Sequence, residues 1–424
     1  MEIGVEIGVA TAAYQIEGAV AEDGRVPSIW DTFSHTPGRT LDGDTGDVAC
    51  DHYHRMPEDV ALMADLGVDA YRFSIAWPRA SNLDFYDRLV DALLERGIAP
   101  LPTLFHWDLP QSIEDEGGWL SRSTAERFAE YAGHVADRLG DRVRRWITLN
   151  EPFVHMAQGY ALGTHAPGHA LLLGALPVAH HQLLAHGLAV AALRERGATQ
   201  VMITNNCSPV LPASDDDADL AAAAVYDAFQ NRLFNDPVLL GEYPDFIAGA
   251  LGDVVRDGDL AAIRAPLDAL GINYYNPTRV GAPPDDADLP FDIRPIEGVP
   301  TTAFGWPVVP SGLRDLLVGL RDRYGAALPP IYITENGCST EDGTADRFRI
   351  DFLDAHLRAL DDAAAAGVDV RGYFVWSLLD NFEWAEGYSQ RFGLVRVDFE
   401  TGERTPKDSY RWLRDSIRSG RWRR

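Results

Sequence analysis

Two glutamates stand where short hydrophobic segments end. Glu151 follows the segment 145–150 and precedes a proline, and Glu335 ends the segment 330–335. Either one alone could simply begin a helix, because acidic side chains suit helix N-termini. Two carboxyl groups across one pocket can also break a glycosidic bond. One of them would protonate the leaving oxygen, and the other would meet the charge that develops at the anomeric carbon.

Other polar and aromatic side chains lie at the ends of similar segments. Indole faces stack on sugar rings and amides bind hydroxyl groups, so these residue types suit a carbohydrate pocket better than a strand interior. The sequence therefore predicts one site, built from several strand ends at once. Its members would be Gln15, Trp77, His106-Trp107, Asn150-Glu151, Asn273-Tyr274-Tyr275, Glu335-Asn336 and Trp376.

The elements that must position these residues alternate along the chain. Short β-branched or aromatic segments are followed by helical stretches, such as 85–96, which stops at Gly97. This alternation predicts βα units and a parallel sheet. Eight segments read as strands: 5–14, 70–77, 98–105, 145–150, 200–206, 269–274, 330–335 and 370–377.

Eight such units without a linker-like stretch predict an α/β protein, a single (β/α)8 TIM barrel over residues 1–424. An open doubly wound sheet is the second choice. The chain has no Gly-x-Gly-x-x-Gly after its first segment, so nucleotide binding has no support. In a barrel, the fourth and seventh strands lie on roughly opposite sides, so Glu151 and Glu335 would face each other across its mouth.

The composition fits a soluble globular enzyme with a large core. Hydrophobic residues make up 46% of the chain, charged residues 24%, and the net charge is −27, which disfavours nucleic acid and anionic membranes as partners. Three distant cysteines, Cys50, Cys207 and Cys338, form neither a disulfide framework nor a zinc motif. Without a recognisable signal segment or membrane-spanning run, we expect a cytoplasmic protein. The sequence is compatible with a monomer or with a homo-oligomer.

Metal ions and cofactors are not expected. His180, His181 and His186 fall on one predicted helix and His52 and His54 before another, without metal-ligand spacing. We expect these five to lie on the surface or to support other residues. The segment 277–310 is rich in Pro, Asp and Gly and lacks periodicity, so it predicts a lid or rim over the site.

Several motifs, in this order along the chain, resemble those of glycoside hydrolase family 1, the β-glucosidase-like enzymes. No single motif would be specific, but together they extend over nearly the whole chain. They are Ala10-Thr-Ala-Ala-Tyr-Gln-Ile-Glu-Gly18, Tyr71-Arg-Phe-Ser-Ile-Ala-Trp-Pro78, His106-Trp-Asp108, Thr148-Leu-Asn-Glu-Pro152, Gly271-Ile-Asn-Tyr-Tyr275, Ile333-Thr-Glu-Asn-Gly337 and Trp376-Ser-Leu-Leu-Asp-Asn-Phe-Glu-Trp384.

The resemblance implies a retaining mechanism. Glu335 would be the nucleophile and Glu151 the general acid and then the general base, with carboxyl groups roughly 5 Å apart. Arg72 and the Tyr275 hydroxyl would lie beside Glu335 and keep it ionised. Asn150 would hold the sugar 2-hydroxyl.

The resemblance also implies which side chains bind the rest of the sugar. Residues at the deep end would bind the 3-, 4- and 6-hydroxyls, with Trp376 beneath the ring and Phe392 closing the pocket. Trp306 is a candidate for the aglycone side, and Asn273 and Trp107 would support the site. The hydroxyl-binding residues would be Gln15, His106, Glu383 and Trp384.

Glu383 bears on which sugar is bound. Family members that act on 6-phosphorylated sugars need a serine there and a lysine soon after, but no lysine lies between Asn381 and Arg396. A 6-phospho-β-glycosidase is therefore disfavoured. We expect glucosides first, such as cello-oligosaccharides from cellulose degradation or aryl and alkyl glucosides, and β-galactosides or β-fucosides second.

The chain departs from the family in three places, which keeps other functions open. The segment 1–8 lacks the usual aromatic lead-in, and the stretches after Arg79 and after Cys338 are short. Shortened loops could open the aglycone side and give a weakly active sugar-binding relative. A non-catalytic relative would be expected to lose one of the two glutamates, and both are present. A transglycosidase, in which an alcohol replaces water, has the same sequence features.

Overall fold

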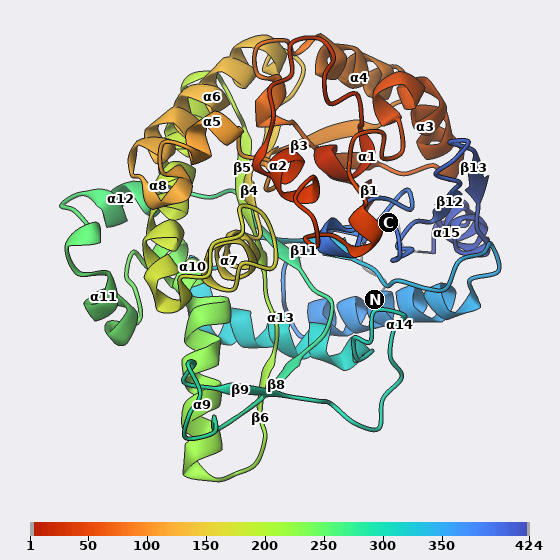
Figure 1. Ribbon diagram of the computed structural model, residues 1–424. Helices are drawn as coiled ribbons and strands as arrows, with labels where there is room; N and C mark the ends of the chain where they lie inside the picture. Colours follow the sequence, from red (N-terminus) through yellow and green to blue (C-terminus); the bar gives the residue numbers. More distant parts are fainter. Residues whose placement is uncertain (1–3, 422–424) are drawn as a thin grey trace.

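The computed structural model describes residues 4–421 and contains a closed barrel of eight parallel strands (Figure 1). Around the barrel the order is β1, β2, β3, β4, β5, β7, β10 and β11, and β11 pairs with β1. The predicted TIM barrel is therefore confirmed. The barrel strands are β1 Glu6–Ala10, β2 Ala70–Ser74, β3 Ala99–Phe105, β4 Arg145–Asn150, β5 Gln200–Asn206, β7 Leu270–Asn273, β10 Ile331–Asn336 and β11 Val370–Trp376.

Helices surround the barrel and follow its strands along the chain (Figure 1). The longer ones are α3 His52–Leu66, α4 Asp84–Glu95, α6 Ser123–Leu139, α8 Leu176–Glu195, α9 Asp217–Asp227, α13 Pro310–Tyr324, α14 Arg347–Ala365 and α15 Asp408–Arg418. Shorter ones are α1 Ala13–Ile16, α2 Ile29–Ser34, α5 Gln111–Glu114, α7 Pro152–Val154, α10 Leu233–Leu239, α11 Asp245–Leu251 and α12 Asp259–Ile263.

Two of the predicted strands are too long. The first ends at Ala10, and α1 follows where strand had been expected. The second ends at Ser74, and Trp77–Arg79 forms a 3-10 turn. Hydrophobic residues continue past both strand ends, so a hydrophobic pattern alone could not place the boundary. Segment 1–8 departs from the family in its sequence, and residues 1–3 of this segment lie outside the described residues.

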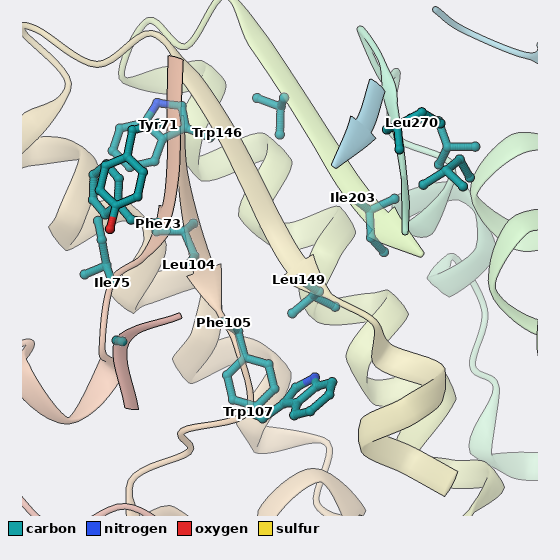
Figure 2. Packing of buried hydrophobic residues seen from close by; sticks show 14 of the residues in the cluster. Tyr71, Phe73, Ile75, Leu104, Phe105, Trp107, Trp146, Leu149, Ile203 and Leu270 are labelled. Atoms are coloured by element: carbon teal, nitrogen blue, oxygen red, sulfur yellow. The ribbon is translucent and has the colours of Figure 1, made fainter. Parts of the chain in front are cut away.

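The core has two parts. Side chains that point inward, including Leu101, Ile147, Met202 and Phe374, fill the barrel itself. A larger cluster joins the strands to the helices, and Figure 2 shows Tyr71 and Phe73 of β2 and Leu104 and Phe105 of β3 among its members. Packing on both faces fixes the strands, and therefore the side chains at their ends.

The segment 277–310 is more ordered than the sequence indicated. Strand β8 Thr278–Gly281 pairs with β6 Val210–Pro212 on one side and with β9 Asp292–Arg294 on the other, in a small side sheet. Phe304 and Trp306 then reach the mouth of the barrel, which agrees with the predicted rim. A second small sheet, β12 Val395–Val397 with β13 Arg404–Pro406, leads into α15.

Between residues 4 and 421, no helix is long and apolar enough to cross a membrane.

Candidate active site

A hollow of about 430 Å³ opens at the carboxyl ends of the barrel strands. It brings together most of the residues that the sequence predicted for the site. The predicted residues that line it are His106, Trp107, Asn150, Glu151, Tyr275, Trp306, Glu335, Trp376, Glu383, Trp384 and Phe392. Arg72, Asn273 and Gln15 lie directly behind this wall, where each donates hydrogen bonds to a lining carboxylate.

Glu335, near the end of β10, is held by donors on both of its oxygens. The Arg72 guanidinium donates to Oε1, and it also donates to the Thr334 carbonyl at 3.1 Å. The Tyr275 hydroxyl donates to Oε2 at 2.7 Å. Arg72 is only 1% exposed, so its charge acts on Glu335 with little screening by water. A fixed cation and a phenol donor therefore hold both oxygens of this carboxyl group in place.

Glu151 lies between β4 and α7 in a different environment. Its Oε1 accepts from the side-chain amides of Asn273 at 2.6 Å and Asn206 at 3.3 Å, and neither donor is charged. Burial and the negative charge of Glu335 raise the pKa of Glu151 from 4.5 to about 8. At neutral pH this carboxyl group therefore carries a proton that it can give away.

The backbone at Glu151 is also unusual. Its φ of 44° lies in the left-handed region, which costs a non-glycine residue roughly 1–2 kcal/mol. The Glu151 amide donates to the Thr204 carbonyl at 2.8 Å, and Pro152 begins α7 immediately afterwards. The turn therefore aims the carboxyl group into the pocket instead of along the strand.

Asn150 joins the two halves of the site. Its Oδ1 accepts from Arg72 at 2.6 Å and from Asn273 at 3.0 Å, so its amide nitrogen must be the donor to Nε2 of His106 at 3.0 Å. Nδ1 of His106 then carries the proton, and this buried atom has no protein partner. Burial and Arg72 hold the pKa of His106 well below its usual value, which keeps the ring neutral.

The deep end of the pocket is built around Gln15 of α1. Its Nε2 donates to Asn381 Oδ1 at 3.0 Å, to the Phe382 carbonyl at 2.9 Å and to Glu383 Oε2 at 3.3 Å. Oε1 of Gln15 is buried without a protein partner. Burial and the charges of Glu335 and Glu151 raise the pKa of Glu383 to about 8.

Aromatic rings form the walls. The His106 ring is nearly parallel to those of Trp376 and Trp384, with centroids 5.8 and 5.9 Å apart. On the other side, Trp306 packs on Phe392 at 5.9 Å and on Tyr275 at 5.2 Å. Flat, mostly apolar walls with a few fixed polar groups between them suit a sugar ring.

Three residues predicted for the site are not part of it. Trp77 stacks on Tyr131 at 5.0 Å among the core residues, and the Tyr274 hydroxyl donates to the Val309 carbonyl at 2.7 Å. Asn336 donates to the Tyr274 carbonyl at 2.7 Å. Neighbouring side chains of a strand point to opposite faces, so only some residues at each strand end can reach the pocket.

Of the two expected positions for the histidines, support of other residues holds for four of them. His180, His181 and His186 of α8 are buried and bind other groups, as His186 binds Thr148 Oγ1 at 2.7 Å. His52 is also buried, paired with Asp59 at 2.8 Å, whereas His54 is exposed. Within residues 4–421, no group of three or more His, Cys, Asp or Glu side chains could hold a metal ion.

The sequence prediction missed several lining residues. Asn206 is the last residue of β5, so the same strand-end reasoning could have found it. Gln158 and His165 come from the π-helical turn His155–Ala161 and the loop after it, where no periodicity marks them. Phe304 lies in the segment 277–310 and stacks on Trp306 at 4.4 Å.

Comparison with known proteins gives one consistent result. The sequence model of Glycosyl hydrolase family 1 matches residues 5–421. The chain is 50% identical to a thermostable beta-glucosidase B of Thermobispora bispora, over 97% of this chain and 89% of that protein. It is 48% identical to a bifunctional beta-D-glucosidase/beta-D-fucosidase of Bifidobacterium breve, over 98% of this chain and 97% of that one.

A solved structure agrees with this. The family 1 b-glucosidase from Thermotoga maritima superposes with a TM-score of 0.93 at 43% identity, covering 98% of this chain and 97% of that one. The resemblance inferred from the motifs is thereby confirmed. The protein belongs to glycosyl hydrolase family 1.

Proposed function

We propose that this protein is a retaining β-glucosidase with Glu335 as nucleophile and Glu151 as acid and then base. The observation that carries the proposal is the contrast between the two carboxyl groups. Glu335 is paired with Arg72 and Tyr275, whereas the pKa of Glu151 is raised to about 8 by burial and by Glu335. One group is ready to attack and the other to donate a proton.

The reaction then has two balanced steps. In the first, Glu335 forms a bond to the anomeric carbon, the glycosidic bond breaks, and the leaving oxygen takes the proton of Glu151. In the second, Glu151 takes a proton from water, the water oxygen bonds to the anomeric carbon, and Glu335 is released. Two inversions give retention of configuration.

The sugar is held by groups that lack protein partners. Nδ1–H of His106 and Oε1 of Gln15 are buried and unpaired, so sugar hydroxyls would satisfy them. Asn150 would hold the 2-hydroxyl, and Glu383 and Trp384 the 4- and 6-hydroxyls, with Trp376 beneath the ring. A 6-phosphate would meet no lysine between Asn381 and Arg396, so 6-phosphorylated sugars are disfavoured. A relative named for both glucosidase and fucosidase activity supports glucosides and fucosides as substrates. Glucosides remain the first choice, with fucosides and galactosides second.

The aglycone side favours aryl and alkyl groups. Trp306 and Phe304 border it, and a second, largely apolar hollow of about 170 Å³ shares Gln158 with the catalytic pocket. Leu172, Leu173 and Ile293 line this second hollow. Cello-oligosaccharides are more polar than aryl and alkyl glucosides, and we propose them as further substrates. We also propose a cytoplasmic location, because the three cysteines are buried and free.

The shortened loops leave the sugar-binding residues in place. Neither 80–83 nor 339–346 lines the catalytic pocket. Ser339 instead supports its wall, because Ser339 Oγ accepts from the Phe304 amide at 2.9 Å. We therefore propose an active enzyme and not a weakened sugar-binding relative.

The test is hydrolysis of nitrophenyl β-glucoside, β-galactoside, β-fucoside and 6-phospho-β-glucoside. We expect the highest kcat/KM with the glucoside and no measurable release from the phosphorylated compound. Proton NMR of the first sugar released should show the β-anomer before mutarotation. Release of the α-anomer, or no release from any substrate, would defeat the proposal. Added alcohol acceptors would show how much glycosyl transfer accompanies hydrolysis.

A further inference from the structure

The chain contains 36 arginines and a single lysine, Lys407. This lysine precedes α15 and is completely buried. Its ammonium group donates to Asp380 Oδ1 at 2.8 Å, and both side chains are 0% exposed. An ammonium is compact, whereas a guanidinium is a wide planar fork. The one lysine therefore provides a compact cation at a fully buried position.

Asp380 belongs to the loop that follows β11. Its Oδ1 also accepts from the Gly393 amide at 2.8 Å, and its own amide donates to the Val395 carbonyl at 3.0 Å. The two segments are in close contact, because a Cβ atom added to Gly393 would lie 2.0 Å from the Asp380 nitrogen. Lys407 and Asp380 thus fix residue 393, the neighbour of the pocket-lining Phe392.

The other side of Asp380 leads to the deep end of the pocket. Asn381 accepts from Gln15 at 3.0 Å, and the same Gln15 nitrogen donates to Glu383 at 3.3 Å. The Asn381 amide group also donates to Ser377 Oγ at 3.2 Å within the loop. Contacts therefore run without interruption from the lysine through Asp380 to the carboxyl group proposed to bind the 4- and 6-hydroxyls.

We infer that Lys407 and Asp380 are positioning residues that hold Glu383 and Phe392 in the geometry required to recognise the hydroxymethyl end of the sugar. The inference rests on the proposed β-glucosidase function. A buried ion pair is weak evidence for stability, because desolvation offsets much of the attraction. Here Oδ2 of Asp380 is buried without a hydrogen bond, and the Arg391 guanidinium lies 3.9 Å from it. Such a pair is better explained by the arrangement it enforces than by its contribution to stability.

The first test compares two substrates in Lys407→Met, which keeps an unbranched side chain one atom shorter and removes the charge. Nitrophenyl β-xyloside lacks the hydroxymethyl group of nitrophenyl β-glucoside. We expect KM for the glucoside to rise and the glucoside-to-xyloside ratio of kcat/KM to fall by roughly tenfold. This is within the range of discrimination that contacts to one substrate group provide. A purely structural role would lower kcat/KM equally for both substrates and leave their ratio unchanged.

Two further variants sharpen the result. Lys407→Arg keeps the charge but not the shape, so it should not restore the ratio. Arg411→Met, on α15 directly after this lysine, removes an exposed partner of Asp408 and should leave both kinetic constants unchanged. A folded Lys407→Met protein with the wild-type ratio, or a Lys407→Arg protein with wild-type behaviour, would overturn the inference. Failure of the wild-type protein to hydrolyse either glycoside would instead overturn the proposed function.

A second measurement uses the wild-type chain and does not depend on a variant that folds. Because the protein has one lysine, growth on ¹³C-labelled lysine gives a single ε-carbon signal in solution. Adding glucose should shift this signal, whereas adding xylose to the same occupancy should shift it less. A lysine signal that stays fixed while glucose saturates the pocket would contradict the coupling between residue 407 and Glu383.

Discussion

The two glutamates of the pocket are the same residue type in contrasting surroundings. Both lie at strand ends on the same rim, Glu151 after β4 and Glu335 on β10. Glu335 contacts a buried guanidinium and a phenol hydroxyl. Glu151 contacts two neutral amides and feels the negative charge of Glu335. In the proposed mechanism, the neighbours of each carboxyl group, and not the residue type, therefore decide which one attacks and which one protonates.

The contrast also makes the two groups interdependent. The charge of Glu335 contributes to the raised pKa of Glu151. When Glu335 forms a covalent bond to the sugar, this charge disappears, so the pKa of Glu151 should fall and its carboxylate should become available as a base. Formation of the bond between Glu335 and the sugar would therefore change Glu151 from an acid into a base.

The largest effect should follow removal of the ionised member. Glu335→Gly deletes the proposed nucleophile, and we expect kcat to fall by roughly 10⁵-fold or more, because such a group acts as a unit with the rest of the site. Azide should fill the space and attack from the same side, which yields an α-glycosyl azide. A β-azide product would contradict the assignment, and Glu341→Gln, in an exposed loop, serves as the control.

Removal of the protonated member should have a smaller and selective effect. In Glu151→Gln, glycosides whose leaving group needs a proton should lose roughly 10²–10⁴-fold in kcat/KM. Dinitrophenyl glucoside leaves without help and should lose much less. Comparing kcat/KM for the two leaving groups measures this, because kcat/KM reports the first chemical step. Equal losses would show that Glu151 is not the acid.

The dependence of one group on the other can be measured directly. Glu335→Gln removes the neighbouring charge and keeps the shape, so the pKa of Glu151 should fall from about 8. We expect the acid dissociation constant of Glu151 to rise by tenfold or more, about the effect of removing one neighbouring like charge. A ¹³C NMR titration of labelled glutamate, with Glu151→Gln for assignment, gives the value. An unchanged pKa would mean that burial alone holds the proton.

Much of this arrangement could be predicted from the sequence. Alternation of strand-like and helix-like stretches predicted the barrel, and segments 145–150 and 200–206 match β4 and β5 residue for residue. Strand-end reasoning found Glu151 and Glu335, and the resemblance to the family added Arg72, which lies within β2 and not at its end. The single-domain organisation over residues 1–424 stays a prediction.

The rest depended on side-chain direction and on loops. Strand-end position could not tell Tyr275, which enters the pocket, from Tyr274, which points to the helices. Irregularities in the pairing of β10 with its neighbours turn Glu335 inward and Asn336 outward. Loop residues such as His165 reach the pocket only through packing between distant segments. Local sequence carries little information on either point.

Asn206 was missed although it is the last residue of β5, and it gives the smallest predicted effect. Its amide donates to Glu151 and favours the ionised form, so it lowers the pKa of that group. In Asn206→Ala the pKa should therefore rise above about 8. Because the acid must be protonated, activity is present below this pKa and lost above it.

The alkaline limb of kcat/KM should move to higher pH in this variant, while the plateau at lower pH changes little. The shift should be a few tenths of a pH unit, since the shorter bond from Asn273, at 2.6 Å, remains. Asn205→Ala is the matched control, because the side-chain amide of this neighbouring residue binds Asn235 outside the pocket. A limb that moved to lower pH would mean that Asn206 stabilises the protonated acid, and the contrast between the two glutamates would then rest on Asn273 and Glu335 alone.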